Sequence, residues 1–104
     1  MIEVLETIER WRGEGQRVAV ATVVAVEQSA PRDPGAVMTV NERGDVAGSV
    51  SGGCVESAVY EEAQDAIATG RPRLVTYGIS DADAISVGLT CGGTIHVFVE
   101  RLDW

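Results

Sequence analysis

The segment Arg17–Gln28 limits the possible folds more than any other part of this sequence. It is rich in β-branched residues, and apolar side chains occupy both of its alternating sets of positions. The first set is Val18, Val20, Val24 and Val26, and the second is Ala19, Ala21, Val23 and Ala25. Because successive side chains of a strand point to opposite faces of its sheet, this pattern indicates cover on both faces. We therefore expect a central strand with other elements packed above and below it.

The length and composition of the chain favour one globular domain. The sequence has 104 residues, of which 45% are hydrophobic and only 5% aromatic, so Val, Ala, Ile and Leu must form the core. A chain of this length buries roughly two-thirds of its unfolded surface in a single core. We expect residues 1–104 to form a single domain.

Two amphipathic helices are predicted, one on each side of a β-hairpin. Apolar residues recur at three- and four-residue steps in Val4–Trp11, and Gly13 ends this helix. The second helix has the apolar stripe Val55, Ala58, Val59, Ala63, Ala66 and Ile67, and Gly70 is its expected C-cap. Between the helices, Ala36–Val40 and Asp45–Val50 are typical of two strands joined by a four-residue turn with glycine.

Two more strands follow the second helix, at Arg73–Tyr77 and Thr94–Glu100. An acidic loop or short helical turn is expected at Gly78–Gly88 between them. The order of elements shows no regular β-α-β repetition. It predicts an α+β fold in which a mixed β-sheet packs with two main helices.

The charge and the apolar runs exclude several kinds of partner. Eight basic and sixteen acidic residues give a net charge of -8, which repels nucleic acid and anionic membranes. The start of the chain is acidic, and the longest apolar run is far shorter than the roughly 20 residues of a membrane helix. We expect a soluble, cytoplasmic protein whose two cysteines are reduced.

Both cysteines lie beside a glycine pair, in mirror order. The two blocks consist of Ser51, Gly52, Gly53 and Cys54, and of Cys91, Gly92 and Gly93. A glycine pair removes side chains from the backbone, so that another group can approach a neighbouring thiol closely. Zinc is a poor interpretation, because Cys54, Cys91 and His96 are too few ligands for a closed site.

Cys54 is expected in the first turn of the second helix. There the helix dipole and unpaired N–H groups would favour its thiolate, and the same N–H groups would bind an anion. Glu56 would either favour the dipole or reach back to the glycine N–H groups as half of a capping arrangement. The alternative for Cys54 is a small, buried packing residue.

Cys91 and Arg32 are weaker candidates. Cys91 lies in a glycine-flanked turn that enters the last strand, and the hypothesis is that this turn meets Cys54; the alternative is a tight turn or bulge with no function. Arg32 lies in the stiff loop Pro31–Gly35, where it would clamp a phosphate or carboxylate, or simply face solvent.

Three blocks together resemble the XdhC/CoxI family, and the resemblance runs from the first helix to Val99. They are Pro34-Gly35-Ala36 with Arg32 nearby, Gly48-Ser49-Val50-Ser51-Gly52-Gly53-Cys54-Val55-Glu56, and Gly88-Leu89-Thr90-Cys91-Gly92-Gly93. Members of this family are accessory proteins that bind molybdenum cofactor, which is molybdopterin or its dinucleotide form. They help to deliver its sulfurated form to apo molybdenum hydroxylases such as xanthine dehydrogenase or carbon monoxide dehydrogenase.

The resemblance implies roles for particular residues. Cys54 would contact molybdenum or its terminal sulfur, and Ser51, Gly52 and Gly53 would bind the cofactor through their backbone. Arg32 would contact phosphate or pterin, and Cys91 with Gly92 would supply a second thiol.

The resemblance also implies partners and one departure from the family. The partners would be the apo-hydroxylase, a second copy in a homodimer, and a cysteine desulfurase or a separate Rossmann-domain chain. Family members usually carry a second, Rossmann-like domain, and none is expected within these 104 residues. The function expected is therefore that of a non-catalytic cofactor chaperone.

Two other functions stay open at this point. One is a small thiol-disulfide redox or sensor protein that uses Cys54 and Cys91 as a reversible pair. The other is a structural or interaction module whose cysteines have no chemical role.

Overall fold

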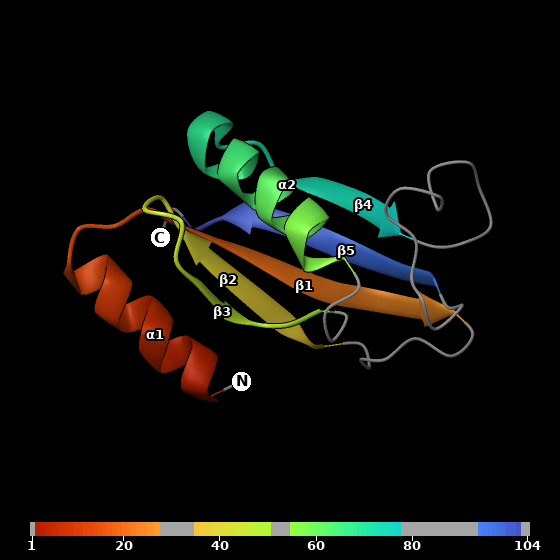
Figure 1. Ribbon diagram of the computed structural model, residues 1–104, viewed down its shortest axis with the longest axis horizontal. Coiled ribbons are helices and arrows are strands. Elements are labelled where there is room, and N and C mark those ends of the chain that lie inside the picture. Colours follow the sequence, from red (N-terminus) through yellow and green to blue (C-terminus); the bar gives the residue numbers. More distant parts are fainter. Residues whose placement is uncertain (1, 28–34, 51–54, 78–93, 103–104) are drawn as a thin grey trace.

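The computed structural model describes residues 2–27, 35–50, 55–77 and 94–102, and Figure 1 shows their arrangement. The elements in chain order are α1 (Ile2–Gly13), β1 (Val18–Glu27), β2 (Val37–Asn41), β3 (Val46–Gly48), α2 (Glu56–Thr69), β4 (Arg73–Tyr77) and β5 (Thr94–Arg101). Every helix and strand predicted in these ranges is confirmed. None of the described helices is long and apolar enough to cross a membrane.

The five strands form one sheet in the order β3-β2-β1-β5-β4. The predicted central position of β1 is confirmed, since β2 and β5 flank it. The α+β class is also confirmed, but all four described strand pairings are antiparallel, so the sheet is antiparallel rather than mixed. The reason is that β5 returns between β1 and β4 and runs opposite to both.

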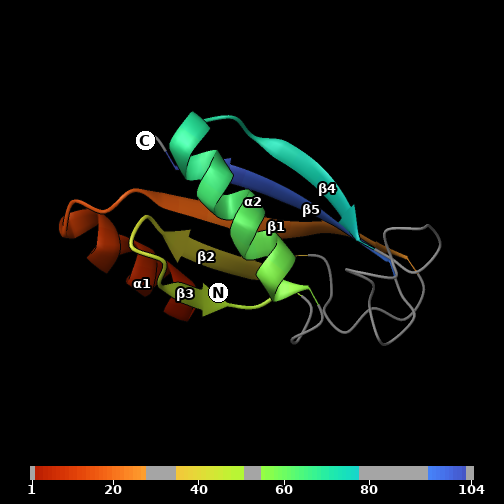
Figure 2. The same ribbon diagram turned by 45° about the horizontal axis from the view of Figure 1, so that its top comes forward.

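The two helices cover opposite faces of the sheet, as Figures 1 and 2 show. Ala19, Ala21 and Val23 are buried in the core cluster that includes α2. Val18, from the other set of β1 positions, is buried in a second cluster with Trp11 of α1. The first half of β1 is therefore covered on both faces, as its sequence predicted.

The second half of β1 departs from this prediction. Val24 is 51% exposed, and Ala25 is exposed as well. The pairing of β1 with β5 shifts register between Val23 and Ala25. A bulge of this kind leaves an extra residue without a cross-strand partner and bends the strand, which explains why apolar residues here escape burial.

The hairpin of β2 and β3 is fixed by buried polar groups. Asn41 is 1% exposed, and its Oδ1 accepts hydrogen bonds from the N–H groups of Arg43 and Asp45 at 3.0 and 2.9 Å. Gly44 has φ +97°, the left-handed conformation predicted for the glycine of this turn. The hairpin thus offers a fixed surface for α2 to pack against.

The C-terminal end of α2 and the buried faces of α2 and β5 are those predicted from the sequence. Gly70 has φ 72° and caps α2 by donating its N–H to the carbonyl of Ala66 at 2.8 Å. The α2 residues Val59, Ala63, Ala66 and Ile67 are buried, as are Ile95, Val97 and Val99 at alternate positions of β5. The position of α2 across the sheet is therefore fixed along its length.

Candidate functional site

The described residues that flank two of the predicted site segments, 28–34 and 78–93, lie at one end of the sheet. Glu27, at the end of β1, pairs with Thr94, at the start of β5. Tyr77, at the end of β4, pairs with Ile95. The backbone of Gly35, which precedes β2, donates a hydrogen bond to the carbonyl of Val23 at 2.7 Å. Segments 28–34 and 78–93 are thus attached to neighbouring strands.

The predicted site residues themselves lie outside the described residues. These are Arg32, Ser51, Gly52, Gly53, Cys54, Cys91 and Gly92. The approach of Cys54 to Cys91 stays a prediction.

The start of α2 differs from the expectation for Cys54. The helix begins at Glu56, and Val55 is its N-cap residue with φ -128° and ψ 13°. Cys54 therefore precedes the first turn, and its predicted position within that turn is wrong. Val55 takes a non-helical backbone conformation, which delays the helix by two residues.

Glu56 ties the start of α2 to the end of the hairpin. Its Oε2 accepts hydrogen bonds from the Ser49 hydroxyl at 2.7 Å and from the Val50 N–H at 3.0 Å. This confirms that Glu56 reaches back toward the preceding chain. The glycine N–H groups proposed as its partners lie outside the described residues.

The segment 51–54 is consequently fixed at both of its attachments. Val50 is 0% exposed and Val55 is 2% exposed, and both belong to the core cluster under α2. With the Glu56 carboxylate bridging the same gap, the two attachment points cannot separate without breaking core contacts. The residues on both sides of the cysteine-bearing segment are thus held in the core.

Gly48 directs the chain from β3 toward this segment, a role that the sequence did not suggest. Its φ is +81°, and a Cβ at this position would lie 2.2 Å from the carbonyl oxygen of Val37. The same oxygen accepts a hydrogen bond from the Ser49 N–H at 3.1 Å. A glycine inside a predicted strand is the signal that could have revealed this close backbone approach.

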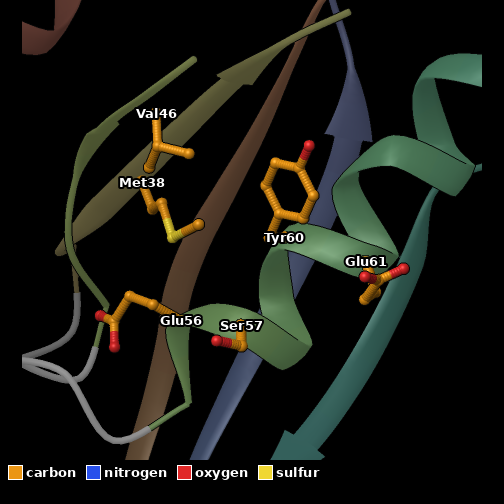
Figure 3. A pocket seen from close by; sticks show the side chains of 6 residues that line it. All are labelled: Met38, Val46, Glu56, Ser57, Tyr60 and Glu61. Atoms are coloured by element: carbon orange, nitrogen blue, oxygen red, sulfur yellow. The ribbon is translucent and has the colours of Figure 1, made fainter. Parts of the chain in front are cut away.

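A pocket of about 350 Å³ lies beside the start of α2 and was not predicted either. Figure 3 shows its six lining residues, which are Met38, Val46, Glu56, Ser57, Tyr60 and Glu61. The four from α2 are related by steps of three or four positions, the spacing that places helical side chains on one face. The pocket therefore lies between this face of α2 and the β2–β3 hairpin.

Two polar side chains near this end of the sheet have distinct environments. Tyr77 is 4% exposed, and among the described residues its hydroxyl has no hydrogen-bond partner. Burial, and secondarily the charge of Glu62, raises the pKa of Tyr77 to about 12, so the phenol is neutral at ordinary pH. The Nδ1 of His96 lies 2.9 Å from the Thr76 hydroxyl on the sheet surface.

In the described ranges, no group of three or more His, Cys, Asp or Glu residues could hold a metal ion.

Comparison with known proteins gives the family. The family model described as "XdhC and CoxI family" matches residues 11–78, more than half of the chain. The chain belongs to the XdhC and CoxI family. The matched range includes Arg32 and the block ending at Cys54, whereas Cys91 and Gly92 lie beyond it.

Two relatives in the family have names that mention molybdenum cofactor or xanthine dehydrogenase. The molybdenum cofactor insertion chaperone PaoD of Escherichia coli (strain K12) is 38% identical over 88 residues, which are 85% of this chain and 27% of the relative. A probable xanthine dehydrogenase subunit of Bacillus subtilis (strain 168) is 39% identical over 92 residues, covering 86% of this chain and 28% of the relative.

A solved structure has the same fold. A crystal structure described as a xanthine dehydrogenase from Bacillus halodurans has a TM-score of 0.79 and 38% sequence identity. The match covers 94% of this chain and 30% of that one. The chain thus spans less than a third of the length of each of these three relatives.

Proposed function

We propose that this protein is a non-catalytic, cytoplasmic chaperone that holds molybdenum cofactor and passes it to an apo molybdenum hydroxylase. Membership of the XdhC and CoxI family supports this function, as does 38% identity to a relative named as a molybdenum cofactor insertion chaperone. The relative named as a probable xanthine dehydrogenase subunit supports a recipient of the hydroxylase class.

The observation that carries this proposal is the mounting of segment 51–54. Buried Val50 and Val55 and the hydrogen bonds of Glu56 fix its two ends at the start of α2. Fixed attachment points reduce the conformational entropy that the connecting residues lose when a ligand binds. In this proposal Cys54 supplies a soft thiolate, and the backbone of Ser51, Gly52 and Gly53 approaches the cofactor closely.

The residues of this chain fit the two chemically different parts of the cofactor. A thiol suits molybdenum or its terminal sulfur, and the cation Arg32 suits a phosphate. When bound, the cofactor supplies the molybdenum and sulfur that a hydroxylase needs. The chain itself binds, orients and shields, and Cys91 with Gly92 serves as a second contact.

The proposal includes further partners. Residues 1–104 act as the cofactor-binding domain, and a Rossmann-like domain acts beside them, either in the same protein or in a separate chain. A cysteine desulfurase supplies the sulfur, and two copies of the chain form a homodimer.

The test is Cys54→Ala, expressed beside the parent chain in a molybdenum-replete host. We expect the parent to retain molybdenum and pterin and Cys54→Ala to lose at least about tenfold of both, because a first ligand is removed. Metal analysis and pterin fluorescence of the purified proteins measure this, and circular dichroism checks that the fold is intact.

Cys91→Ala is the matched control, and we expect it to lose less cofactor than Cys54→Ala. Equal retention by Cys54→Ala and the parent would refute the assigned role of Cys54. A reversible two-electron couple between the two cysteines in the cytosolic range would instead support a thiol redox protein.

A further inference from the structure

The pocket beside α2 has the composition of a small-molecule site. Its volume of about 350 Å³ lies at the lower end of the range for ligand pockets, roughly 300–1,000 Å³. Its apolar walls are Met38 and Val46 of the hairpin and the ring of Tyr60. Figure 3 shows the side chain of Met38 extending from the sheet toward α2, with Tyr60 rising from the helix beside it. This space suits one flat ring system better than a whole nucleotide.

The polar groups of the pocket select against anions. The lining residues with polar side chains are Glu56, Glu61, Ser57 and Tyr60, and no described lysine or arginine lines the pocket. Carboxylates accept hydrogen bonds and repel phosphate. The two acidic residues, with no cation beside them, favour a neutral or cationic ring that carries N–H donors.

We propose that this pocket binds the 2-amino-4-oxopyrimidine edge that pterins and guanine share. This inference rests on the proposed function and names the part of the cofactor that the pocket holds. The amino group and the adjacent ring N–H of this edge form a pair of parallel donors, which matches the two oxygens of one carboxylate. Cytosine has no such pair of donors, because its ring nitrogen is an acceptor.

Glu61 is the carboxylate that receives this edge. Glu56 is already engaged, since its Oε2 accepts from Ser49 and Val50 at 2.7 and 3.0 Å. Glu61 lies on an exposed position of the next helical turn. Glu56 is thus a positioning residue that fixes the pocket wall, and Glu61 is the ligand-binding acceptor.

Tyr60 is placed to pack against the ring of the ligand. A Cβ added to Gly44 in the hairpin turn would lie 2.9 Å from the Tyr60 hydroxyl, so the turn backbone closely approaches this side chain. A side chain restrained in this way offers its aromatic face at little further entropic cost. The thioether of Met38 adds a polarisable contact.

The pocket lies beside the described residues that flank segment 51–54. Glu56 lines the pocket and also ties α2 to Ser49 and Val50, directly before segment 51–54. The aromatic end of a cofactor held in the pocket would therefore lie beside the attachment points of the cysteine-bearing segment. Its phosphate would lie outside the acidic pocket.

The test is a titration of the ¹⁵N-labelled chain followed by amide chemical shifts. The probes are 6-hydroxymethylpterin, guanosine 5′-monophosphate, cytidine 5′-monophosphate and inorganic phosphate. We expect 6-hydroxymethylpterin or guanosine monophosphate to shift the amides of residues 38, 46 and 56–61, and the other two probes to leave them unchanged. Whichever of 6-hydroxymethylpterin and guanosine monophosphate binds more tightly shows whether the pocket holds the pterin or a guanine nucleotide.

Two pairs of variants test the assigned residues. Glu61→Gln should weaken probe binding about tenfold by removing a charged acceptor, and Glu9→Gln on the opposite side of the sheet should not change it. Ser57→Phe fills the pocket from an exposed position and should abolish binding, whereas Ala68→Phe, exposed near the end of the same helix, should not.

The possible results separate this inference from the proposed function. Absence of pocket shifts with both aminopyrimidinone probes, or equal shifts with cytidine monophosphate, would overturn the pocket assignment. If Glu61→Gln and Ser57→Phe retain molybdenum as the parent does while Cys54→Ala loses it, the chaperone function stands and the pocket assignment falls. If the parent retains no cofactor, the chaperone function fails, and the probe titration still decides the pocket.

Discussion

At the scale of the residue, Gly48 shows how one backbone conformation fixes the path of the chain into the cysteine-bearing segment. The left-handed conformation at φ +81° brings the Ser49 N–H to the Val37 carbonyl at 3.1 Å. That position also presents the Ser49 hydroxyl to Glu56. One glycine therefore determines whether the Glu56 tie can form.

Gly48→Ala is predicted to destabilise the fold by at least about 2 kcal/mol. The left-handed conformation alone costs a residue with a Cβ roughly 1–2 kcal/mol, and the new Cβ meets the Val37 carbonyl. Urea unfolding measures the loss. Gly13→Ala is the control, because a Cβ there has nothing within 4 Å and alanine favours a helix more than glycine does, so we expect no loss of stability and a gain of up to about 1 kcal/mol. Equal effects of the two substitutions would contradict this account.

At the scale of the element, Arg73 joins the edge strand β4 to α2. Its Nη1 donates to Oε1 of Glu62 at 3.0 Å and also contacts the Asp65 carboxylate. Hydrogen bonds to Asp65 and then to Glu62 raise the pKa of Arg73 further, so the guanidinium stays charged. The side chain of Arg73 is only 20% exposed, whereas those of Glu62 and Asp65 are 38% and 58% exposed. The tie is therefore partly shielded from solvent.

Arg73→Ala is predicted to loosen β4 more than the rest of the sheet. We expect a loss of about 1 kcal/mol in global stability, the upper range for exposed ion pairs, together with faster amide exchange in residues 73–77. Urea unfolding measures the first, and hydrogen exchange followed by mass spectrometry measures the second. Arg71→Ala makes the same change of charge two residues away and should leave β4 exchange unaltered. Uniformly faster exchange across all strands in Arg73→Ala would argue against a local tie.

At the scale of the whole molecule, two core clusters share the same strands. The cluster under α2 includes Ala19 and Met38, and the cluster under α1 includes Val18 and Val37, so adjacent residues of β1 and β2 serve both. Neither helix can detach from the sheet without exposing the apolar residues on one face of these strands to solvent. The described part of the chain is therefore expected to unfold as one unit.

The prediction is that Trp11 fluorescence and far-ultraviolet circular dichroism report the same urea midpoint. Trp11 is 5% exposed in the cluster under α1, whereas circular dichroism reports on both helices and the sheet. The measurement uses a Trp104→Phe background, so that Trp11 is the sole tryptophan. An earlier fluorescence midpoint would mean that α1 detaches independently and would refute the idea of a shared core.

The parts of the fold predicted from sequence are those encoded by local patterns. In Arg17–Gln28, apolar residues in both alternating sets of strand positions indicated a central strand. In β5, the alternation of Ile95, Val97 and Val99 indicated one buried face. The antiparallel direction of all the described pairs was not predicted, because pairing joins residues as distant as Ala19 and Arg101. Strand periodicity carries no information about the direction of such a partner.

The site was predicted less completely, for the same physical reason. The cysteine and glycine motifs are contiguous and could be found, together with the family that they resemble. The pocket could not, because Met38 and Tyr60 meet only when the hairpin packs against α2. The start of α2 was placed two residues early, because the backbone conformation of Val55 is not apparent from its apolar pattern.

The two edge strands of the described sheet differ in how readily they could pair with a strand of another copy of the chain. β3 has only three residues and ends at the left-handed Gly48, whereas β4 at the opposite edge has five residues in extended conformation. A short, interrupted edge is a poor template for a further strand. If two copies joined through β4, each would have used its one receptive edge, and addition of copies by strand pairing would stop at two. The asymmetry of the sheet thus disfavours fibrils and permits a closed pair.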